Sequence, residues 1–357
     1  MSLQTRISSL QKIVRENGYD GFLIYSPENL FYLTSFYATE YGYLLVTEKK
    51  VFLLTNFIYK EQALDCFKKI KGEIVDCKGK CIEFLRENLK KNGKYYIEGV
   101  IPHYIYKSLS SELIGIKLDS NVEILKKMRM IKEKDEIKSI TEAIELTEKG
   151  FDYIRKVIKP GLSELEIKAE LEYFLARHGA EKMSFDSIIA AGKNSAYPHA
   201  KTGNGKVKKG DFLKMDFGIF QGHYCSDMTR TVGIGSLNRK QLEIYHVVLE
   251  AQLAAMDGIR PGMKGREAHE LAGNVIARAG YGDYFGHGLG HGVGLEVHEG
   301  PRLSAMSEDE LKPGMVVTVE PGIYLPGLGG VRIEDIVVIE KKGCRSLNHA
   351  CKELVLL

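Results

Sequence analysis

The sequence predicts an α/β domain followed by a larger α+β domain that contains an internal duplication. Helical and strand-like patterns alternate over the first ~120 residues, which is typical of an α/β layer domain. Residues 158–180 match residues 259–281 at a constant offset of 101, with seven identities in 23 positions and no gap. This match predicts two related halves in the second domain. Two similar helix starts are the alternative, because Pro-Gly is common before a helix.

The elements of the first domain follow from apolar patterns that are punctuated by glycine, proline and charged turns. Gly18 ends the first helix, Pro27 stops the first strand, and charged residues 48–50 form a turn between two strands. The expected helices cover residues 3–17, 57–67 and 81–90, and the expected strands cover residues 21–25, 43–46, 51–54 and 95–97. This domain contains no concentrated cluster of chemically reactive side chains.

A domain boundary is expected where basic residues cluster between residues 120 and 132, and we place the domains at 1–124 and 125–357. A long helix follows, because apolar residues recur every three or four positions from 137 to 158, with Thr147 as the exception. Pro160-Gly161 ends this helix. Ser163 and Glu166 then have the spacing of a capping box, which predicts the start of the next helix.

Composition excludes several classes of protein. Lys plus Arg is 50 and Asp plus Glu is 47, so the net charge of +3 does not indicate a nucleic-acid or anionic-membrane partner. No apolar stretch approaches the ~18 residues that span a bilayer, and the N-terminus lacks the apolar core of a signal peptide. The six cysteines are therefore expected as reduced thiols in a cytoplasmic protein, and Cys77 and Cys81 lack the spacing of a zinc ribbon.

Two aspartates beside a predicted hairpin are candidate metal ligands. Gly222 suits the positive φ of a tight turn, and a two-residue loop at 221–222 would pair Asp216 with Asp227 across the strands. Directly opposed residues lie roughly 4.5–5.5 Å apart at Cβ, where like charges repel unless a cation lies between them. A solvated Asp beside the turn would explain only one of the two, so we favour a metal-binding pair.

Three histidines follow in a glycine-rich segment. Glycine occupies every second position from 286 to 294, around His287 and His291, and His298 lies shortly after. This spacing argues against a helix, so the first two histidines are not a helical zinc-binding pair. Bare glycines allow backbone or substrate to approach closely. A glycine-rich loop with incidental histidines is the alternative, but three histidines within twelve residues favour a site.

Two glutamates complete the acidic set. Glu320 ends an apolar strand that begins at Val316, and Glu334 is expected inside the next strand, on the same face as Arg332. A single buried Glu could simply pair with Arg332, but two Glu beside two Asp are better explained by metal. Four carboxylates carry a charge of −4, which two divalent cations balance. An oxygen-rich ligand set suits Mn²⁺ or Co²⁺ at least as well as Zn²⁺.

Together these segments resemble the pita-bread metallopeptidases, the family that includes prolidase, aminopeptidase P, methionine aminopeptidase and creatinase. The resemblance covers nearly the whole chain. It implies an α/β creatinase-like N-terminal domain and an α+β pita-bread catalytic domain with a pseudo-twofold duplication. It also implies two divalent metal ions bridged by Asp227 and Glu334. The five implied ligands are Asp216, Asp227, His291, Glu320 and Glu334.

The subfamily is narrowed by what other members lack. Creatinase lacks the metal ligands, and methionine aminopeptidase usually lacks both the N-terminal domain and an Arg two positions before the last Glu. Arg332 occupies that position, and residues 287–299 resemble the signature of the proline-peptidase branch. The resemblance also implies roles around the metal ligands: His199, His287, His298 and Glu320 as catalytic residues, and Phe185, Ile188, Arg302 and Arg332 as substrate-binding residues.

The implied activity is that of an Xaa-Pro dipeptidase, which hydrolyses the bond between an N-terminal residue and proline through a metal-bridging hydroxide, with Glu320 as proton shuttle. Arg302 would hold the carboxylate of a dipeptide through a buried charged pair, although a surface Arg beside Pro301 is an equal alternative. The nearest alternative activity is an Xaa-Pro aminopeptidase that acts on longer peptides. A catalytically inactive peptide-binding module fits the complete ligand set poorly. The expected partner is a small peptide with proline second, and the family implies a homodimer.

Overall fold

The computed structural model describes residues 2–40 and 42–357, and the chain divides into two compact units, Met1–Arg129 and Met130–Leu357. The boundary expected between residues 124 and 125 falls inside helix α6 (Glu123–Met130). Each unit has its own sheets and its own apolar core.

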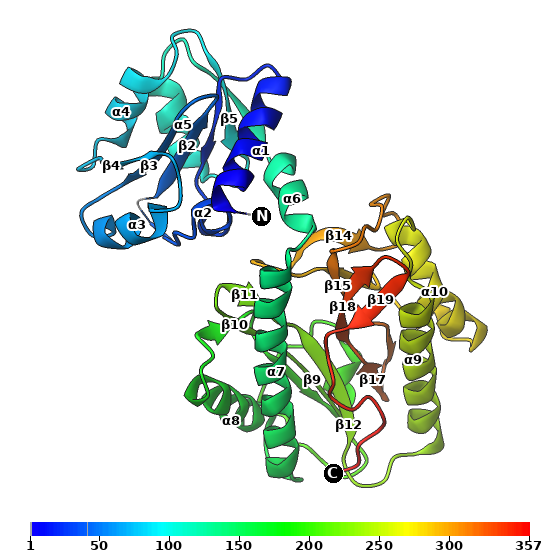
Figure 1. Ribbon diagram of the computed structural model, residues 1–357. Helices are drawn as coiled ribbons and strands as arrows, with labels where there is room; N and C mark the ends of the chain where they lie inside the picture. The colour runs from blue at the N-terminus through cyan, green and yellow to red at the C-terminus, as the bar shows by residue number, and fades with distance from the viewer. Residues whose placement is uncertain (1, 41) are drawn as a thin grey trace. The chain divides into compact units, whose positions relative to one another are not determined.

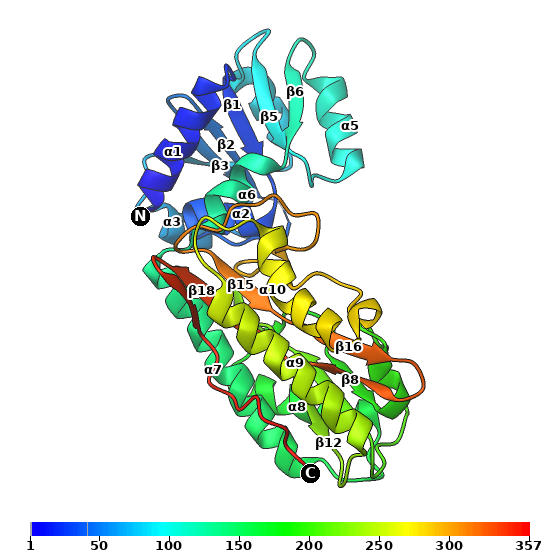
Figure 2. The same ribbon diagram turned by 90° about the vertical axis from the view of Figure 1, so that its right-hand side faces the viewer.

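The N-terminal unit is a mixed sheet with helices on both faces (Figures 1 and 2). Leucines of α4 and α5 pack on the face that presents Leu23 and Leu45, and α1 contacts β1 and β2 from the other side. The strands, in the sheet order β4-β3-β2-β1-β5-β6, are β1 (Gly21–Ile24), β2 (Tyr43–Thr47), β3 (Val51–Thr55), β4 (Glu73–Asp76), β5 (Lys94–Glu98) and β6 (Lys117–Asn121). The helices before α6 are α1 (Leu3–Glu16), α2 (Pro27–Thr34), α3 (Lys60–Phe67), α4 (Cys81–Asn88) and α5 (His103–Glu112).

The expected α/β alternation is confirmed, although α2, β4, α5, β6 and α6 were not among the expected elements. The first strand ends at Ile24, before the expected stop at Pro27, and Pro27 begins α2. Ser26 caps that helix by accepting a hydrogen bond from the Asn29 backbone, and Pro27 occupies the first turn, where its missing N–H costs nothing. Ser26 and Pro27 therefore start a helix shortly after the first strand ends.

The second unit places two pairs of long helices around several antiparallel sheets. Figure 1 shows α7 and α9 on opposite sides of the strands β9, β12 and β17. The helices are α7 (Lys134–Val157), α8 (Glu164–Arg177), α9 (Arg239–Gly258) and α10 (Gly265–Arg278), with 3₁₀ turns at Gly192–Ala196 and Gly282–Tyr284. The first half forms sheets β12-β9-β8 and β11-β10-β7, from β7 (Lys182–Met183), β8 (Ile188–Ala191), β9 (Phe212–Phe217), β10 (Ile219–Gln221), β11 (Tyr224–Cys225) and β12 (Met228–Gly233). The second half forms sheets β14-β13-β15-β18-β19 and β16-β17, from β13 (Gly290–Gly292), β14 (Glu299–Leu303), β15 (Val316–Val319), β16 (Gly322–Leu325), β17 (Gly329–Arg332), β18 (Asp335–Glu340) and β19 (Gly343–Ser346).

The duplication inferred from the offset of 101 is confirmed in the backbone. Gly161 and Gly262 both follow a long helix with positive φ, at +98° and +89°. Their N–H groups donate to Val207 O and Leu311 O, each at the same place in its half. At the start of α8 and of α10 a glutamate accepts a hydrogen bond from the N-cap backbone N–H, Glu166 from Ser163 and Glu267 from Lys264, and in α8 the Ser163 hydroxyl completes a capping box. The shared Pro-Gly is therefore part of a repeated supersecondary unit and not only of two similar helix starts.

Each half of the second unit contains a separate apolar cluster, one drawn from residues 143–234 and the other from residues 212–339. The polar exception predicted on the long helix, Thr147, is fully buried in the first half. Its hydroxyl lies 2.6 Å from Ser226 Oγ and also donates to Ala143 O, so burial leaves it hydrogen-bonded. Among the described residues, no helix combines the length and apolarity that a bilayer span requires.

Candidate metal centre and active site

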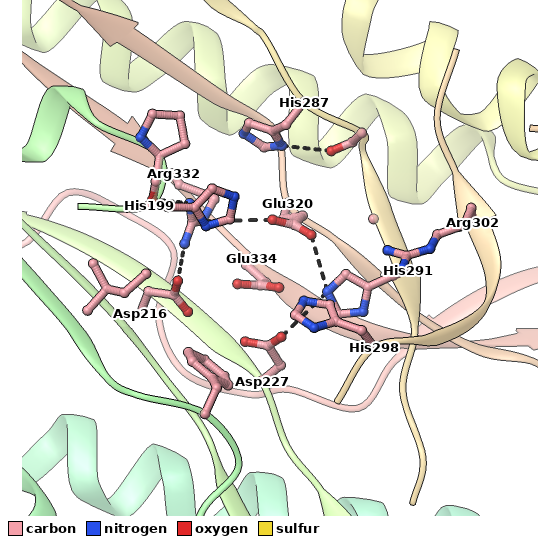
Figure 3. Close-up of a pocket in the computed structure, with 15 residues that line it drawn as sticks. His199, Asp216, Asp227, His287, His291, His298, Arg302, Glu320, Arg332 and Glu334 are labelled. Carbon is pink, nitrogen blue, oxygen red and sulfur yellow. Dashed lines mark hydrogen bonds and ion pairs between the residues drawn. The ribbon is translucent and has the colours of Figure 1, made fainter. Parts of the chain in front are cut away.

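A cavity of about 500 Å³ in the second unit brings together every site residue expected from the sequence. Figure 3 shows carboxylates from the first half and carboxylates with imidazoles from the second half around a common space. The twelve expected residues that line it are Phe185, Ile188, His199, Asp216, Asp227, His287, His291, His298, Arg302, Glu320, Arg332 and Glu334.

The two aspartates reach the cavity by a different register from the one expected. Strands β9 and β12 pair Asp216 with Thr229, so Asp216 and Asp227 are not direct cross-strand partners. The hairpin turn lies at Gly222 and His223, whose φ values are +56° and +67°. Positive φ at both central residues is the geometry of a type I′ turn. Asp227 lies just before β12, and both carboxylates line the cavity.

The glycine-rich segment is non-helical, as predicted, and its glycines allow close backbone contact. A Cβ on Gly290 would lie 2.0 Å from Thr318 O, and one on Gly292 would lie 2.0 Å from Gly300 O. Only glycine fits on either side of His291, so the sequence places that imidazole on a strand packed closely between two neighbours. Glu334 differs from the prediction, since it lies between β17 and β18 and not inside a strand.

Asp227, His291 and Glu334 form the tightest group of potential ligands, with donor atoms all within 4.8 Å of one another. The three side chains are buried, at 4%, 5% and 1% exposure. Asp227 Oδ1 is a buried oxygen with no hydrogen-bond partner among the described residues. A buried oxygen of this kind is costly unless a cation or another donor compensates it.

His291 is in the form that a metal ligand requires. Burial, followed by the nearby His298, lowers its pKa to about 3, so the ring is neutral and its contacts with carboxylates are not ion pairs. Its Nδ1 donates to Gly292 O at 3.1 Å, which leaves the lone pair on Nε2. That atom lies 3.6 Å from Asp227 Oδ2 and 3.5 Å from Glu320 Oε1. A lone pair that faces carboxylate oxygens is repulsive until a cation lies between them.

The carboxylates themselves carry the signature of an anionic cluster. Burial is the largest cause that raises the pKa of Glu334, to about 7, and the charge of Asp216 adds to it. Burial and then the charge of Glu334 raise the pKa values of Asp227 and Glu320 well above the ordinary range. Several carboxylates that cannot all ionise together are what a divalent metal pair relieves. The donor set and the orphan oxygen therefore fit two divalent ions.

Arg332 pairs with a different carboxylate from the one considered for it. Its guanidinium binds Asp216 and lies 3.9 Å from Glu320 Oε2, whereas pairing with Glu334 had been the simple alternative. Glu334 instead accepts a hydrogen bond from Thr229 Oγ1 at 2.6 Å. Arg332 thus supplies the positive charge on the side of the cavity that Asp216 and Glu320 share.

Hydroxyls behind the carboxylates were missed by the sequence reading. Thr229 donates to Glu334, and Thr318 Oγ1 donates to Glu320 Oε1 at 3.3 Å while it accepts from the backbone N–H of His291. Each threonine lies two positions from a proposed ligand, and the period of two along a strand would have placed it on the ligand's side. Such partners orient ligands and fix their hydrogen bonds.

Lys214 and Tyr324 were also missed, and they connect the cavity to the segment that carries His199. Lys214 is fully buried, and its Nζ donates to Tyr197 O at 2.6 Å and to Pro198 O at 3.1 Å. The Nζ also lies 5.0 Å from the centre of the Tyr324 ring. Arg332 Nη1 donates to Pro198 O as well, at 3.3 Å. Burial, and then the charge of Arg332, lowers the pKa of Lys214 to about 6, and these two basic side chains together hold the backbone directly before His199.

The three histidines outside the proposed ligand set differ in the hydrogen bonding and exposure of their rings. His287 uses both ring nitrogens: Nδ1 lies 2.8 Å from Gly288 O and Nε2 lies 2.9 Å from the Tyr324 hydroxyl. Burial is the main cause that lowers its pKa to about 4, so its neutral ring lines the cavity. His199 and His298 are exposed at the cavity wall. Their rings are accessible to a ligand in the cavity.

The expected proline pocket and carboxylate anchor also line the cavity. Phe185 and Ile188 are half-buried, and together they offer an apolar wall. Arg302 lies on β14 with an exposed side chain, whereas a buried guanidinium had been assumed. The energetic contribution of Arg302 should therefore be that of a partly solvated charge.

Comparison with known proteins agrees with this fold. The sequence profile of metallopeptidase family M24 matches residues 138–341, and that of the creatinase/prolidase N-terminal domain matches residues 6–131. The chain therefore belongs to metallopeptidase family M24. The expected creatinase-like N-terminal domain and pita-bread catalytic domain are confirmed.

The similarity to individual members extends over the whole chain. An Xaa-Pro dipeptidase from Pyrococcus furiosus is 38% identical over 353 residues, which is 99% of this chain and 100% of that protein. The structure of an Xaa-Pro dipeptidase from Bacillus anthracis matches with a TM-score of 0.95 and 39% identity, over 99% of this chain and 100% of the other. The structure of an X-Pro aminopeptidase from Thermotoga maritima matches with a TM-score of 0.88 and 35% identity, over 97% and 100% of the two chains.

Proposed function

We propose that this protein is an Xaa-Pro dipeptidase that holds two divalent metal ions and cleaves the bond between an N-terminal residue and proline. The observation that carries the proposal is that five potential ligands, three further histidines and the apolar side chains Phe185 and Ile188 line one cavity. Full-length similarity to Xaa-Pro dipeptidases supports the same substrate class.

The ligands that would hold the two ions are Asp216, Asp227, His291, Glu320 and Glu334. A divalent pair in such a site supplies Lewis acidity and lowers the pKa of water toward neutrality. Because four of the five donors are carboxylates, we propose Mn²⁺ or Co²⁺ as the working metal, with Zn²⁺ as an alternative.

The remaining side chains would manage protons, charge and orientation. Glu320, whose pKa is raised by burial, accepts the proton of the attacking water and delivers it to the leaving nitrogen. His199 and His298, exposed at the cavity wall, donate hydrogen bonds to the oxyanion that develops on the scissile carbonyl. Phe185 and Ile188 pack on the proline ring. Arg302 binds the terminal carboxylate of a dipeptide, and the neutral ring of His287 lines the site.

The experiment that tests this function compares hydrolysis of Ala-Pro with hydrolysis of Ala-Pro-Ala in the presence of Mn²⁺ and of Co²⁺. The proposal expects cleavage of both peptides, with the higher kcat/KM for Ala-Pro. A preference for Ala-Pro-Ala would identify an Xaa-Pro aminopeptidase instead, which the exposed position of Arg302 and the Thermotoga maritima match keep as the second candidate. Failure to cleave either peptide with full metal occupancy would favour a peptide-binding module.

The proposal includes two broader features. We infer a homodimer from the family, and we infer a cytoplasmic location because six unpaired cysteines suit a reducing compartment. Sedimentation of the purified protein checks the first, and fractionation of the source cells checks the second.

A further inference from the structure

A second cavity, of about 540 Å³, lies in the N-terminal unit, and two cysteine side chains line it. Cys77 and Cys81 share its wall with the aromatic rings of Tyr25, Tyr43 and Tyr104. Neither thiol takes part in the activity proposed above. Two thiols that open into one cavity make a potential reactive site, provided that the backbone holds them close together and one of them is acidic.

The backbone between the two cysteines is a tight turn. Lys80 N donates to Cys77 O at 2.7 Å, and the two central residues, Lys78 and Gly79, have φ values of +48° and +82°. Positive φ at both central positions is the type I′ geometry, and a lysine adopts it only at some cost in backbone energy. Cys77 is fixed from its other side, since its N–H donates to Thr55 O at 2.9 Å. The turn brings Cys81, the first residue of α4, to the same cavity as Cys77.

The two thiols have unequal acidity and accessibility. The neighbouring Cys77 thiol is the largest cause that lowers the pKa of Cys81, and a backbone hydrogen bond at the start of α4 lowers it further. The neighbouring Cys81 thiol, together with burial, raises the pKa of Cys77. Cys77 is buried at 6% exposure, whereas Cys81 is partly exposed. The accessible sulfur is therefore also the one that ionises more readily, which is the arrangement of a reactive thiol beside a second thiol.

We propose that Cys77 and Cys81 form a peroxide-reactive dithiol site that closes to an intramolecular disulfide. The Cys81 thiolate attacks one oxygen of a hydroperoxide, the O–O bond breaks, and the alcohol or water leaves with a proton. This step leaves Cys81 as a sulfenic acid. The Cys77 sulfur then attacks the Cys81 sulfur and expels water, which carries away the Cys77 proton. The two sulfurs lose two electrons in total, and the peroxide accepts them.

The test treats the full-length protein with hydrogen peroxide, removes the excess with catalase and counts thiols after denaturation. The expected result is a loss of two of the six thiols per chain, restored by dithiothreitol. Cleavage after glutamate releases residues 74–83, a peptide that contains both Cys77 and Cys81 and no other cysteine. Mass spectrometry should find this peptide lighter by two hydrogen atoms. If that peptide stays a dithiol while other cysteines oxidise, the proposal is wrong.

Variants separate this site from simple exposure. Cys351 is the exposed cysteine, so an account based on exposure alone expects it to react first. The proposal expects Cys81 to lose its thiol faster than Cys351, and it expects Cys351→Ser to leave disulfide formation unchanged. Cys77→Ser should convert the product to a Cys81 sulfenic acid that dimedone traps, and Cys81→Ser should keep Cys77 reduced. Equal oxidation of Cys77 in the Cys81→Ser protein would overturn the assignment of roles.

Discussion

The first and second halves of the catalytic unit share a backbone plan but supply different chemistry to the cavity. In each half a long helix, a Pro-Gly turn and a capped second helix lead into strands that carry acidic side chains. Asp216 lies opposite Ile188, and Glu320 N donates to Leu289 O, which is the residue 101 positions after Ile188. Asp216 and Glu320 are therefore counterparts across the duplication.

The two halves differ in the imidazole and in the basic side chains that they supply. The residue 101 positions before His291 is Ala190, so only the second half supplies an imidazole to the proposed ligand set. The first half supplies the buried Lys214, and the second half supplies Arg332. These two basic side chains both donate to Pro198 O. The two halves therefore place acidic side chains at equivalent positions but supply different further groups. The proposed site needs groups from both halves.

The largest effect is expected when either half loses one of the proposed bridging ligands. Asp227→Asn in the first half and Glu334→Gln in the second should each remove most bound metal. Activity should fall by more than the roughly 10–100-fold that is typical of outer partners of a metal site. Elemental analysis and Ala-Pro hydrolysis measure both effects. Full metal content in either variant would contradict the assignment, and Asp186→Asn, an exposed acid outside the cavity lining, is a matched control that should change neither.

His199 tests whether the first half also contributes a group that acts on substrate. His199→Ala should lower kcat by about 10²–10³, because an oxyanion donor is lost, and metal content should stay at the parent value. His178, an exposed histidine on the same half, is the control position. If His199→Ala loses a metal ion, His199 is a ligand and the assignment is wrong.

The acidic cluster gives the metal-free protein an unusual pH dependence. Burial raises the folded-state pKa of Glu334 from 4.5 to about 7, so between these values the folded state binds more protons than the unfolded state. Stability of the metal-free protein should therefore fall as pH rises through this window, by up to a few kcal/mol. Bound metal should remove this loss. The increase in Tm on adding Mn²⁺ should be larger at pH 8 than at pH 5, and an increase that shrinks with pH would count against the cluster.

Lys214 of the first half and Arg332 of the second half both donate to the backbone before His199, so a substitution of Lys214 tests the contribution of the first half alone. Lys214→Met keeps the side-chain volume but removes both hydrogen bonds to the carbonyls before His199. As a positioning residue, it should lower kcat by about 10–100-fold with metal content preserved. KM should change less than kcat, because the apolar wall at Phe185 is untouched. Equal changes in kcat and KM, or loss of folding measured by circular dichroism, would mean a purely structural role.

The smallest effect is expected at Arg302. Because the side chain is exposed, its pair with a dipeptide carboxylate should contribute about 1 kcal/mol or less, and not the larger value of a buried pair. Arg302→Ala should reduce kcat/KM for Ala-Pro by about fivefold and leave Ala-Pro-Ala nearly unchanged. Equal losses on both peptides would remove Arg302 from the carboxylate site.

Chemistry and spacing in the sequence pointed to side chains that the fold brings to one cavity. The glycine-rich segment around His291 is non-helical as predicted, whereas Glu334 lies between two strands and not inside one. The predicted hairpin register was wrong. The turn includes His223, which adopts positive φ although it is not a glycine, and no sequence pattern indicated this. The role of Lys214 could not be predicted from the sequence. Its hydrogen-bond acceptors are backbone carbonyls of an irregular segment that lies beside Lys214 only in the folded chain. Arg332 pairs across the two halves with Asp216, which depends on how the halves meet.

The central claim is that both halves together hold two divalent ions that the peptidase activity requires. The most direct measurement titrates dialysed, metal-free protein with Mn²⁺ while the bound ions per chain and Ala-Pro hydrolysis are followed in the same samples. We expect no turnover without metal and a rise in activity that levels off at two ions per chain. Normal turnover by the metal-free protein, or full activity with a single ion bound, would contradict the account.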